Sequence, residues 1–199
     1  ELRVATSVLA GRVQNPNIDD QLKLTRLLQY LNETKELGLT FRKGSTKIKA
    51  YADAAHLVHP DCRGHSGAVI QMGNNSIHCE SKKQRVVSQS STEAELIALN
   101  SCLNSVLWIR NMLEELGFKQ NKTKIYQDNI SCITIAHNGR PTKGTKHIKM
   151  RYFHIKEKMN DGTVKLKHKS TNKMIADILT KPVELIPAFN RLRNKIIGN

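Results

Sequence analysis

The chain of 199 residues has no run of apolar residues approaching the roughly 18 to 20 that a membrane span requires. Its N-terminus also lacks the basic and then apolar pattern of a secretory signal. Its four cysteines, Cys62, Cys79, Cys102 and Cys132, form no C-x-x-C pair and are widely spaced. This spacing favours free thiols in a reducing compartment. We therefore expect a protein that has no membrane partner, is not secreted and works in the cytoplasm.

Acidic residues are also scarce, with 17 Asp and Glu against 32 Lys and Arg, for a formal net charge of +15. A globular domain this basic usually binds a polyanion, because phosphates attract cationic surfaces and release counterions on contact. The hydrophobic content of 39% and the charged content of 25% are close to globular averages, so a wholly disordered chain is excluded as the first interpretation. Nucleic acid is the predicted partner.

The first residue is Glu1 rather than Met, in a pattern typical of the middle of a helix. We expect a fragment or a processed piece of a longer polyprotein. A second helix should follow an N-cap at Asn17, because its leucines recur on one face, at positions 24, 27, 28 and 31. Residues 1–45 are thus predicted to form a helical segment ahead of the next domain.

Alternating residues predict strands at 46–53, at 66–72 and around 77–81, and the short turn at 73–75 makes the last two antiparallel. A long helix should follow, capped by Ser91 or Thr92 with Glu95 reaching back. A strand at 124–128, helices, and a strand at 164–168 are typical of parallel β-α-β units. The prediction is an α/β fold with one mixed five-stranded sheet flanked by helices.

Four carboxylates end or open these elements: Asp53, Glu95, Asp128 and Asp177, the last on a short helix at 172–180. If the first and fourth strands are neighbours, Asp53 and Asp128 lie side by side. Carboxylates so close stay ionised together only when cations lie between them, and their hard oxygens suit Mg²⁺ or Mn²⁺ rather than zinc. Two such ions support phosphoryl displacement. The alternative is that each Asp only ends a strand or opens a turn, and that Glu95 only caps its helix.

Several motifs together resemble the ribonuclease H domain of copia-type retrotransposon Pol polyproteins. They are the runs at 51–54, 81–84 and 90–95, then Asp128-Asn129, the run 145–148 with Arg151-Tyr152, and the run 176–182 (Ala-Asp-Ile-Leu-Thr-Lys-Pro). Residues 1–45 resemble the segment that joins the reverse transcriptase thumb to this domain. The resemblance implies a ribonuclease H-like domain over residues 46–182, with a helical tail at 183–199.

The same resemblance implies an endonuclease that cuts the RNA strand of an RNA–DNA hybrid, joined to a reverse transcriptase in one polyprotein inside a virus-like particle. It implies two Mg²⁺ ions, with Mn²⁺ possible. Asp53 would bridge both ions, Glu95 and Asp128 would complete the site at the leaving group, and Asp177 would help to hold the ion that activates water. Glu95 is a better match than Glu93, because Glu-Leu-x-Ala starts there.

Cellular ribonucleases H carry a mobile histidine near the last aspartate, and His168 lies one position from the matching spacing. The resemblance therefore suggests a role for His168 in product release or proton transfer, while the alternative is a strand histidine with an ordinary partner. Contacts to nucleic acid are expected from six polar or basic residues: Lys82, Lys83, Asn129, Lys146, His147 and Arg151.

Three other interpretations are open. His56, His59, Cys62 and His65 are spaced three apart and could bind zinc, although a loop containing Pro60 and Gly64 rarely closes a tetrahedron of such ligands. The fold could also be catalytically idle and serve only to bind nucleic acid beside a reverse transcriptase. A DNA-cutting relative such as an integrase is the third, and the motifs at 82–84, 90–95 and 179–182 argue against it.

Overall fold

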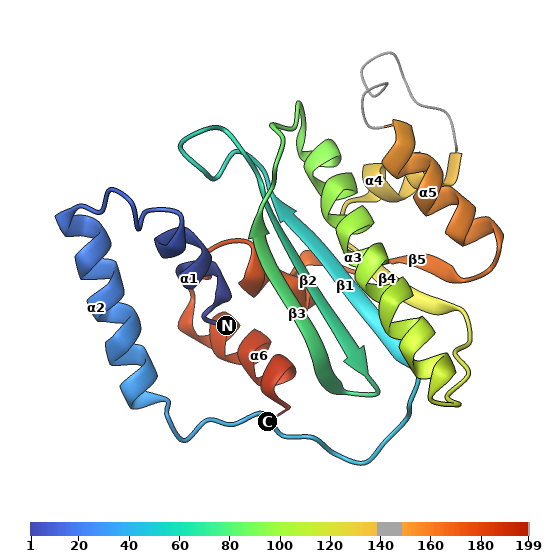
Figure 1. Ribbon diagram of the computed structural model, residues 1–199, viewed down its shortest axis with the longest axis horizontal. Coiled ribbons are helices and arrows are strands. Elements are labelled where there is room, and N and C mark those ends of the chain that lie inside the picture. Colours follow the sequence, from blue (N-terminus) through green and yellow to red (C-terminus); the bar gives the residue numbers. More distant parts are fainter. Residues whose placement is uncertain (139–148, 199) are drawn as a thin grey trace.

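The computed structural model describes residues 1–138 and 149–198 of the chain (Figure 1). In this part a five-stranded sheet has the order β3-β2-β1-β4-β5. The antiparallel strands are β1 (Ile48–Ala55), β2 (His65–Met72) and β3 (Asn75–Lys83). β4 (Thr123–Gln127) is parallel to β1, and β5 (Val164–His168) is parallel to β4. The predicted α/β fold with a mixed sheet is confirmed.

One face of the sheet packs against α3 (Ser91–Glu115), as Figure 1 shows. Because strand side chains alternate between faces, Ile48, Ala50 and Ala52 all point into this core, where they meet Leu99 and other buried residues of α3. Two further helices, α4 (Ile130–Asn138) and α5 (Lys149–Asn160), contribute buried residues to the same core. This side of the sheet holds the larger apolar core.

The opposite face is covered only in part. The 3₁₀ turn η3 (Ile175–Leu179) and α6 (Ile186–Ile197) form a second core there with Tyr51 and Val69. The residues of β1 that alternate with the first core, Lys49, Tyr51 and Asp53, therefore point to this second face. The face combines an apolar patch with the polar side chains that form the candidate site.

The N-terminal helices are α1 (Arg3–Ala10) and α2 (Ile18–Glu33). Asn17 caps α2 as expected: its side chain accepts from the Asp20 amide, and the Asp20 carboxylate accepts from the Asn17 amide, which completes a capping box. The leucine face of α2 is not buried in the described part of the chain: Leu28 is 56% exposed. α2 thus adds little apolar burial to the sheet domain.

Two local predictions were wrong. The cap of α3 is Ser90, whose hydroxyl accepts from the Glu93 amide, and Glu93 in turn accepts from the Gln89 amide. The cap therefore lies one or two residues earlier than expected, at Ser90 rather than at Ser91 or Thr92, and Glu95 takes no part in it. The expected helix at 172–180 is two 3₁₀ turns, η2 (Thr171–Lys173) and η3, because Met174 between them has an extended backbone and a fully buried side chain.

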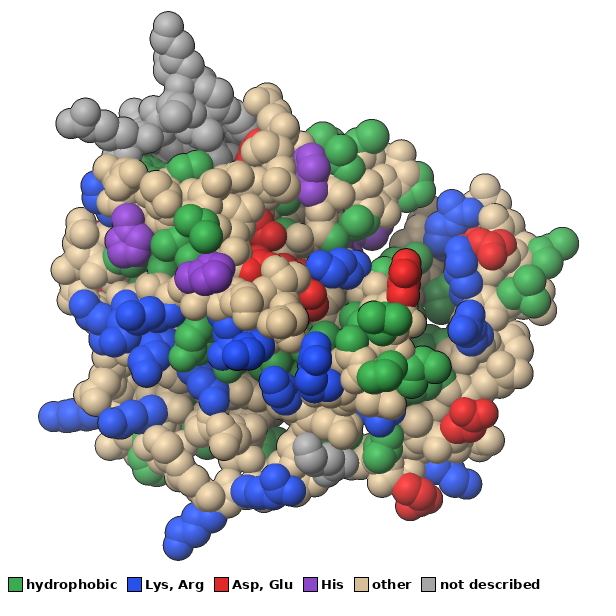
Figure 2. All heavy atoms as spheres, turned by 180° about the vertical axis from the view of Figure 1, so that it is seen from behind, with side chains coloured by type: hydrophobic (Ala, Val, Ile, Leu, Met, Phe, Trp, Pro, Cys, Tyr) green, Lys and Arg blue, Asp and Glu red, His purple; other side chains and the backbone are tan. Residues whose placement is uncertain are grey.

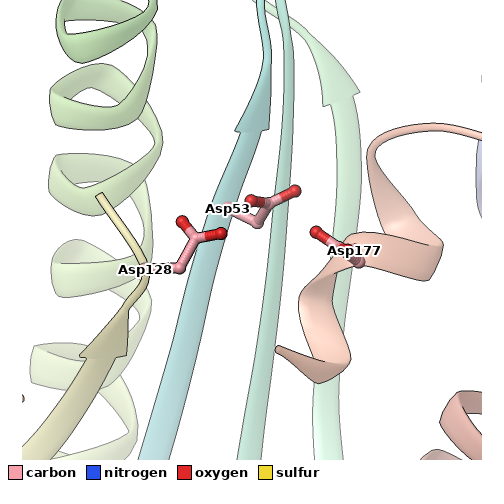
Figure 3. A group of neighbouring side chains, drawn as sticks. All are labelled: Asp53, Asp128 and Asp177. Carbon is pink, nitrogen blue, oxygen red and sulfur yellow. The ribbon is translucent and has the colours of Figure 1, made fainter. Parts of the chain in front are cut away.

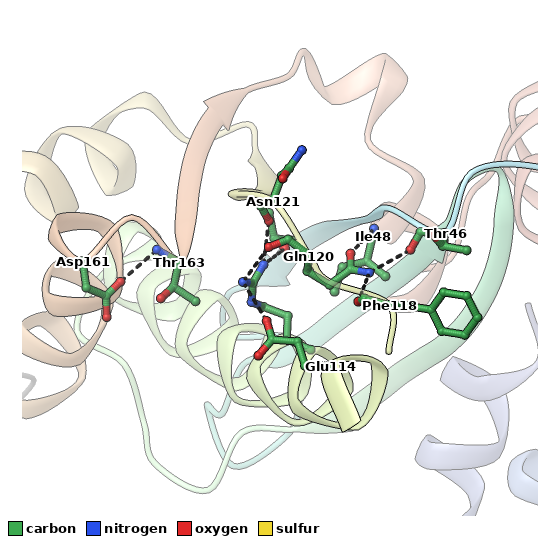
Figure 4. Close-up of polar contacts among 10 residues, drawn as sticks. Thr46, Ile48, Glu114, Phe118, Gln120, Asn121, Asp161 and Thr163 are labelled. Atoms are coloured by element: carbon green, nitrogen blue, oxygen red, sulfur yellow. Dashed lines mark hydrogen bonds and ion pairs between the residues drawn. The ribbon is translucent and has the colours of Figure 1, made fainter. Parts of the chain in front are cut away.

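A polar network ties the end of α3 to the starts of β4 and β1 (Figure 4). The guanidinium of Arg110 donates to the carbonyls of Gln120 and Asn121 and to the Thr123 hydroxyl. The Gln120 side chain accepts from the Ile48 amide and donates to the Thr46 carbonyl. These bonds satisfy buried backbone groups and hold β1 and β4 in register. No helix among the described residues combines the length and the apolar character needed to cross a membrane.

Candidate active site

Three aspartates from distant parts of the chain converge on the second face of the sheet (Figure 3). β1 and β4 are parallel neighbours, with Tyr51 paired to Tyr126, so Asp53 and Asp128 follow side by side two residues later. Asp177 faces them from η3. One carboxylate oxygen from each residue lies within 4.8 Å of the others. The predicted juxtaposition of Asp53 with Asp128 is present, and Asp177 joins it.

The site is buried enough for its charges to oppose one another. Asp53 is 2% exposed, and burial followed by the charge of Asp177 raises its pKa from 3.8 to about 8. The hydroxyl of Thr180 and the ammonium of Lys181 act in the opposite direction, but they do not cancel the effect. Without a further cation, Asp53 therefore favours the protonated form near neutral pH.

Glu95 lies beside this group but outside it. It projects from α3, on the other side of the sheet, and is not among the carboxylates that meet within 4.8 Å. Burial followed by the charges of Asp53 and Asp128 raises its pKa to about 9. Glu95 is thus an electrostatic neighbour of the aspartates, and the structure brings together three of the four predicted carboxylates.

Gln127 connects Glu95 to the aspartates. It is fully buried at the end of β4, where its Nε2 donates to Glu95 Oε2 at 3.0 Å. Its Oε1 accepts from the backbone amides of Asp128 at 2.7 Å and Asn129 at 3.2 Å. One amide side chain therefore orients a carboxylate on α3 and the turn that carries Asp128. Gln127 was not among the predicted site residues, although a polar residue at an inward position of β4 is a signal of such a role.

Other side chains hold the aspartates directly. The hydroxyl of Thr180 donates to Asp53 Oδ2 at 2.5 Å, and the hydroxyl of Thr171 donates to Asp128 Oδ2 at 2.7 Å. Lys181 Nζ lies 3.2 Å from Asp177 Oδ1. Thr180 and Lys181 stand in the same run as Asp177, so this run delivers both a carboxylate and the groups that position the carboxylates.

The donor set fits a divalent cation. The three aspartates offer hard oxygen atoms from separate elements, as Mg²⁺ and Mn²⁺ prefer. Asp177 Oδ1 is buried and faces the Lys181 ammonium at 3.2 Å, so this oxygen already carries a cationic partner that a divalent ion would replace. A bound cation would also relieve the repulsion that raises the pKa of Asp53.

The other predicted site residues are distributed differently. His168 is exposed at the end of β5, where it pairs with Gln127, so it lies at the edge of the site. Asn129 caps α4 by accepting from the Cys132 amide. Lys82 pairs with Glu80, and Lys83 Nζ lies 2.7 Å from Asp61. Arg151 is half-buried on α5, whereas Lys146 and His147 lie outside the described residues.

The four residues of the zinc alternative do not come together as a set of ligands. His59 Nε2 and His65 Nδ1 lie 3.0 Å apart, but His65 turns its other nitrogen to the Ser81 hydroxyl. His56 contacts Ser88 instead, and Cys62 is exposed. In the ranges that the structure describes, only the three aspartates meet the spacing of a metal site. The histidines form ordinary polar contacts around β2.

The architecture matches solved ribonuclease H structures. One is LC11-RNase H1 isolated from compost, with a TM-score of 0.51, 19% identity and coverage of 73% of this chain and 97% of that one. Another is the N-terminal RNase H domain of rv2228c from Mycobacterium tuberculosis, with a TM-score of 0.50, 14% identity and coverage of 75% and 98%. These similarities establish an RNase H-like fold.

Sequence relatives identify the family. The chain is 32% identical over 199 residues to the Pol polyprotein of transposon RE2 from Arabidopsis thaliana. The aligned region covers 98% of this chain and 14% of the relative. It is 33% identical over 180 residues to the Pol polyprotein of transposon TNT 1-94 from Nicotiana tabacum. That aligned region covers 90% of this chain and 14% of the relative. No protein-family model matches the chain. The chain belongs to the Ty/copia-type retrotransposon Pol polyproteins and spans about one seventh of the length of these relatives.

Proposed function

We propose that this chain is a metal-dependent endonuclease that hydrolyses the RNA strand of RNA–DNA hybrids during reverse transcription of a retrotransposon. The observation that carries the proposal is the convergence of Asp53, Asp128 and Asp177 within 4.8 Å on an RNase H-like sheet. The surplus of positive charge supports a nucleic-acid substrate, and the retrotransposon relatives support a hybrid formed by reverse transcription. An idle binding module has no use for three converging carboxylates, two of which, Asp53 and Asp177, are buried.

Each carboxylate has a proposed part. Asp53, at the centre, would bind both of two Mg²⁺ or Mn²⁺ ions, while Asp128 and Asp177 would each hold one of them from opposite sides. Glu95 would join Asp128 on its side of the site. When bound, such ions activate a water molecule and stabilise the leaving oxygen. The chain's own contribution is to orient the carboxylates, through Thr180, Thr171 and Gln127.

The polyprotein context suggests the remaining roles. We propose that residues 1–45 connect to a reverse transcriptase in the same polyprotein, that residues 46–182 form the nuclease domain and that residues 183–199 form its tail, inside a cytoplasmic virus-like particle. His168 at the edge of the site would assist product release or proton transfer. Contacts with the hybrid are proposed for the predicted polar and basic residues, namely Lys82, Lys83, Asn129, Lys146, His147 and Arg151.

The direct test compares labelled RNA–DNA, RNA–RNA and DNA–DNA duplexes of one sequence with the chain of residues 1–199. We expect cleavage of the RNA strand in the hybrid alone, in Mg²⁺ or Mn²⁺, and none after chelation. Cleavage that persists after chelation would exclude the metal-dependent mechanism. Binding of the hybrid without cleavage in either metal would leave a binding module instead.

Gln127 provides a prediction about positioning. Gln127→Leu keeps the size of the side chain but leaves Glu95 and the Asp128 amide without their partner, so the metal ligands lose their orientation. Because groups that orient metal ligands typically contribute about 10- to 100-fold in metal affinity or activity, the Mg²⁺ concentration for half-maximal cleavage should rise by that factor. Ile109→Val in the core of α3 is the control for stability alone. An equal Mg²⁺ requirement in both variants would show that Gln127 only supports the fold.

A further inference from the structure

A basic cleft lies on the second face of the sheet, below the aspartates, with a volume of about 870 Å³. The residues that line it include nine Lys or Arg and no Asp or Glu. They include residues from the first halves of β1 and β4 and the residue just after β5. Others come from the segment before β1 and from the last residues of α6. Figure 2 views the molecule from behind and shows Lys and Arg side chains gathered across this face beneath a recessed group of acidic side chains.

The cleft is continuous with the candidate active site. Its upper lining contains Tyr51, Tyr126 and Ile175, which stand two residues before Asp53, Asp128 and Asp177 respectively. On a strand, residues two apart point to the same face and are separated by about 6.6 Å. Lys49 lies two residues before Tyr51 on β1, and Lys124 lies two residues before Tyr126 on β4. A chain that leaves the carboxylates along β1 and β4 would therefore pass the tyrosines and then the lysines.

The lysines of the cleft lack anionic partners. In the described part of the chain, Lys49, Lys124 and Lys169 form no ion pair with a carboxylate, in contrast to Lys82 and Lys83 near β3. Burial and the charge of Lys169 lower the pKa of Lys49, and burial and the charge of Lys195 lower the pKa of Lys169. Gathering these charges costs energy that a bound polyanion would recover.

Aromatic side chains complete the cleft. The rings of Tyr51 and Tyr126 stack with their centroids 5.0 Å apart, and Lys169 Nζ lies 4.4 Å from the Tyr126 centroid. Tyr51 is buried and Lys169 lies over both rings, so the cleft offers cations to phosphates rather than open rings to bases. A positively charged groove that follows the backbone is one part of the usual surface for single-stranded nucleic acid. The volume falls within the roughly 300–1000 Å³ of sites that enclose small ligands, which suits a few nucleotides of one strand.

We propose that this cleft binds a single-stranded stretch of the RNA strand that passes through the carboxylate site, with its lysines contacting the phosphates. The proposal rests on the proposed function, because the strand held at the aspartates is taken to be RNA. It goes further by assigning a site for RNA beyond the hybrid, formed by residues that do not take part in cleavage.

The test measures equilibrium binding by fluorescence anisotropy with hybrids that share one duplex. One hybrid is blunt, two carry a single-stranded extension of the RNA strand at either the 5′ or the 3′ end, and two carry the same extension on the DNA strand. Every protein carries Asp128→Asn, so that binding is measured in Mg²⁺ without turnover. We expect one of the RNA extensions to tighten binding by about 10-fold and the DNA extensions to add little.

The triple variant Lys49→Gln, Lys124→Gln and Lys169→Gln should remove this gain. It should also reduce the slope of log affinity against log salt by about 2, because each of the three lost phosphate contacts contributes about 0.7 to the slope for a single strand. Lys124→Gln alone, at an exposed position, should remove about a third of that slope. The control is Lys35→Gln, just after α2, which should behave as the parent chain.

Equal affinity for blunt and extended hybrids, an equal gain from the DNA extensions, or a triple variant that matches Lys35→Gln would each overturn the proposal. Its failure differs from failure of the proposed function. If the RNA extension has no effect but the wild type still cleaves hybrids, only the proposal that the cleft binds RNA is rejected. If the wild type does not cleave hybrids but the RNA extension still tightens binding through the lysines, the proposed nuclease function is rejected. The cleft would then remain a site for single-stranded RNA.

Discussion

Asp53→Asn is expected to reduce hybrid cleavage by about 10³-fold and, at the same time, to stabilise the metal-free protein. The loss of activity follows because a neutral amide holds a divalent cation weakly, and the several kcal/mol that metal ions contribute to charge stabilisation correspond to about three factors of ten in rate. The gain in stability follows because Asp53 is buried against Asp177 and its ionised form is unfavourable in the fold. The measurements are single-turnover cleavage in Mg²⁺ and thermal unfolding in a chelator.

The matched control is Asp20→Asn, which also removes one negative charge. Asp20 accepts hydrogen bonds from the Asn17 amide and from Arg12, and these contacts lower its pKa. Its neutralisation should therefore lower the unfolding temperature and leave cleavage unchanged, the reverse of the Asp53 variant. If Asp53→Asn cleaves as well as Asp20→Asn, Asp53 is not a metal ligand; if both are destabilised alike, the repulsion between aspartates is not expressed in the fold.

The unfolding temperature of the metal-free protein should fall as the pH rises through the neutral range. The pKa of Asp53 in the fold is about 8, above its ordinary 3.8, and that of Glu95 is about 9, above its ordinary 4.5. The folded state therefore binds more protons than the unfolded state between about pH 4 and about pH 8 to 9, and stability decreases with pH across that window. Burial lowers the pKa of His65 to about 4, so His65 costs stability only below about pH 6.5.

Unfolding is best compared at about pH 7 and pH 8.5, where the contribution of His65 is constant. The two carboxyls together should lose roughly 1–3 kcal/mol there, or on the order of 5 °C for a domain of this size. Millimolar Mg²⁺ should raise the unfolding temperature more at the higher pH, because protons and metal compete for the same oxygens. Asp53→Asn should have a flatter profile. A profile that is the same with and without Mg²⁺ would argue against a metal at this site.

These expectations differ in how far they depend on residues that are adjacent in the sequence. Asn17 and its helix follow from a local rule, since a capping side chain needs only the amide three residues ahead. The strands follow from alternation, and the parallel direction of β4 and β5 follows from the β-α-β order. The pairing of β1 with β4 was only a condition of the predicted site, and the folded sheet meets it. The chemical type of the site, oxygen ligands for a hard cation, follows from the carboxylates themselves.

Other features arise only when the chain is folded. Thr180 reaches Asp53 across 127 positions of sequence, and Gln127 reaches Glu95 across 32. The cap of α3 was expected at Ser91 or Thr92, because Ser90, Ser91 and Thr92 are all suitable caps, and only the folded backbone distinguishes Ser90 among them. The continuation of the site into the basic cleft likewise depends on the pairing of β1 with β4 and on the position of α6.

The sequence by itself therefore determined the fold class and the family resemblance, and it predicted a site of four carboxylates, of which the three aspartates meet. The tertiary structure alone decided that Glu95 stands outside their 4.8 Å group, that Gln127 joins it to Asp128, and that nine basic residues surround one cleft beneath them. The physical reason is that propensity and alternation act over a few residues. Burial, and the charge repulsion that follows from it, depend instead on which distant segments share one face of the sheet.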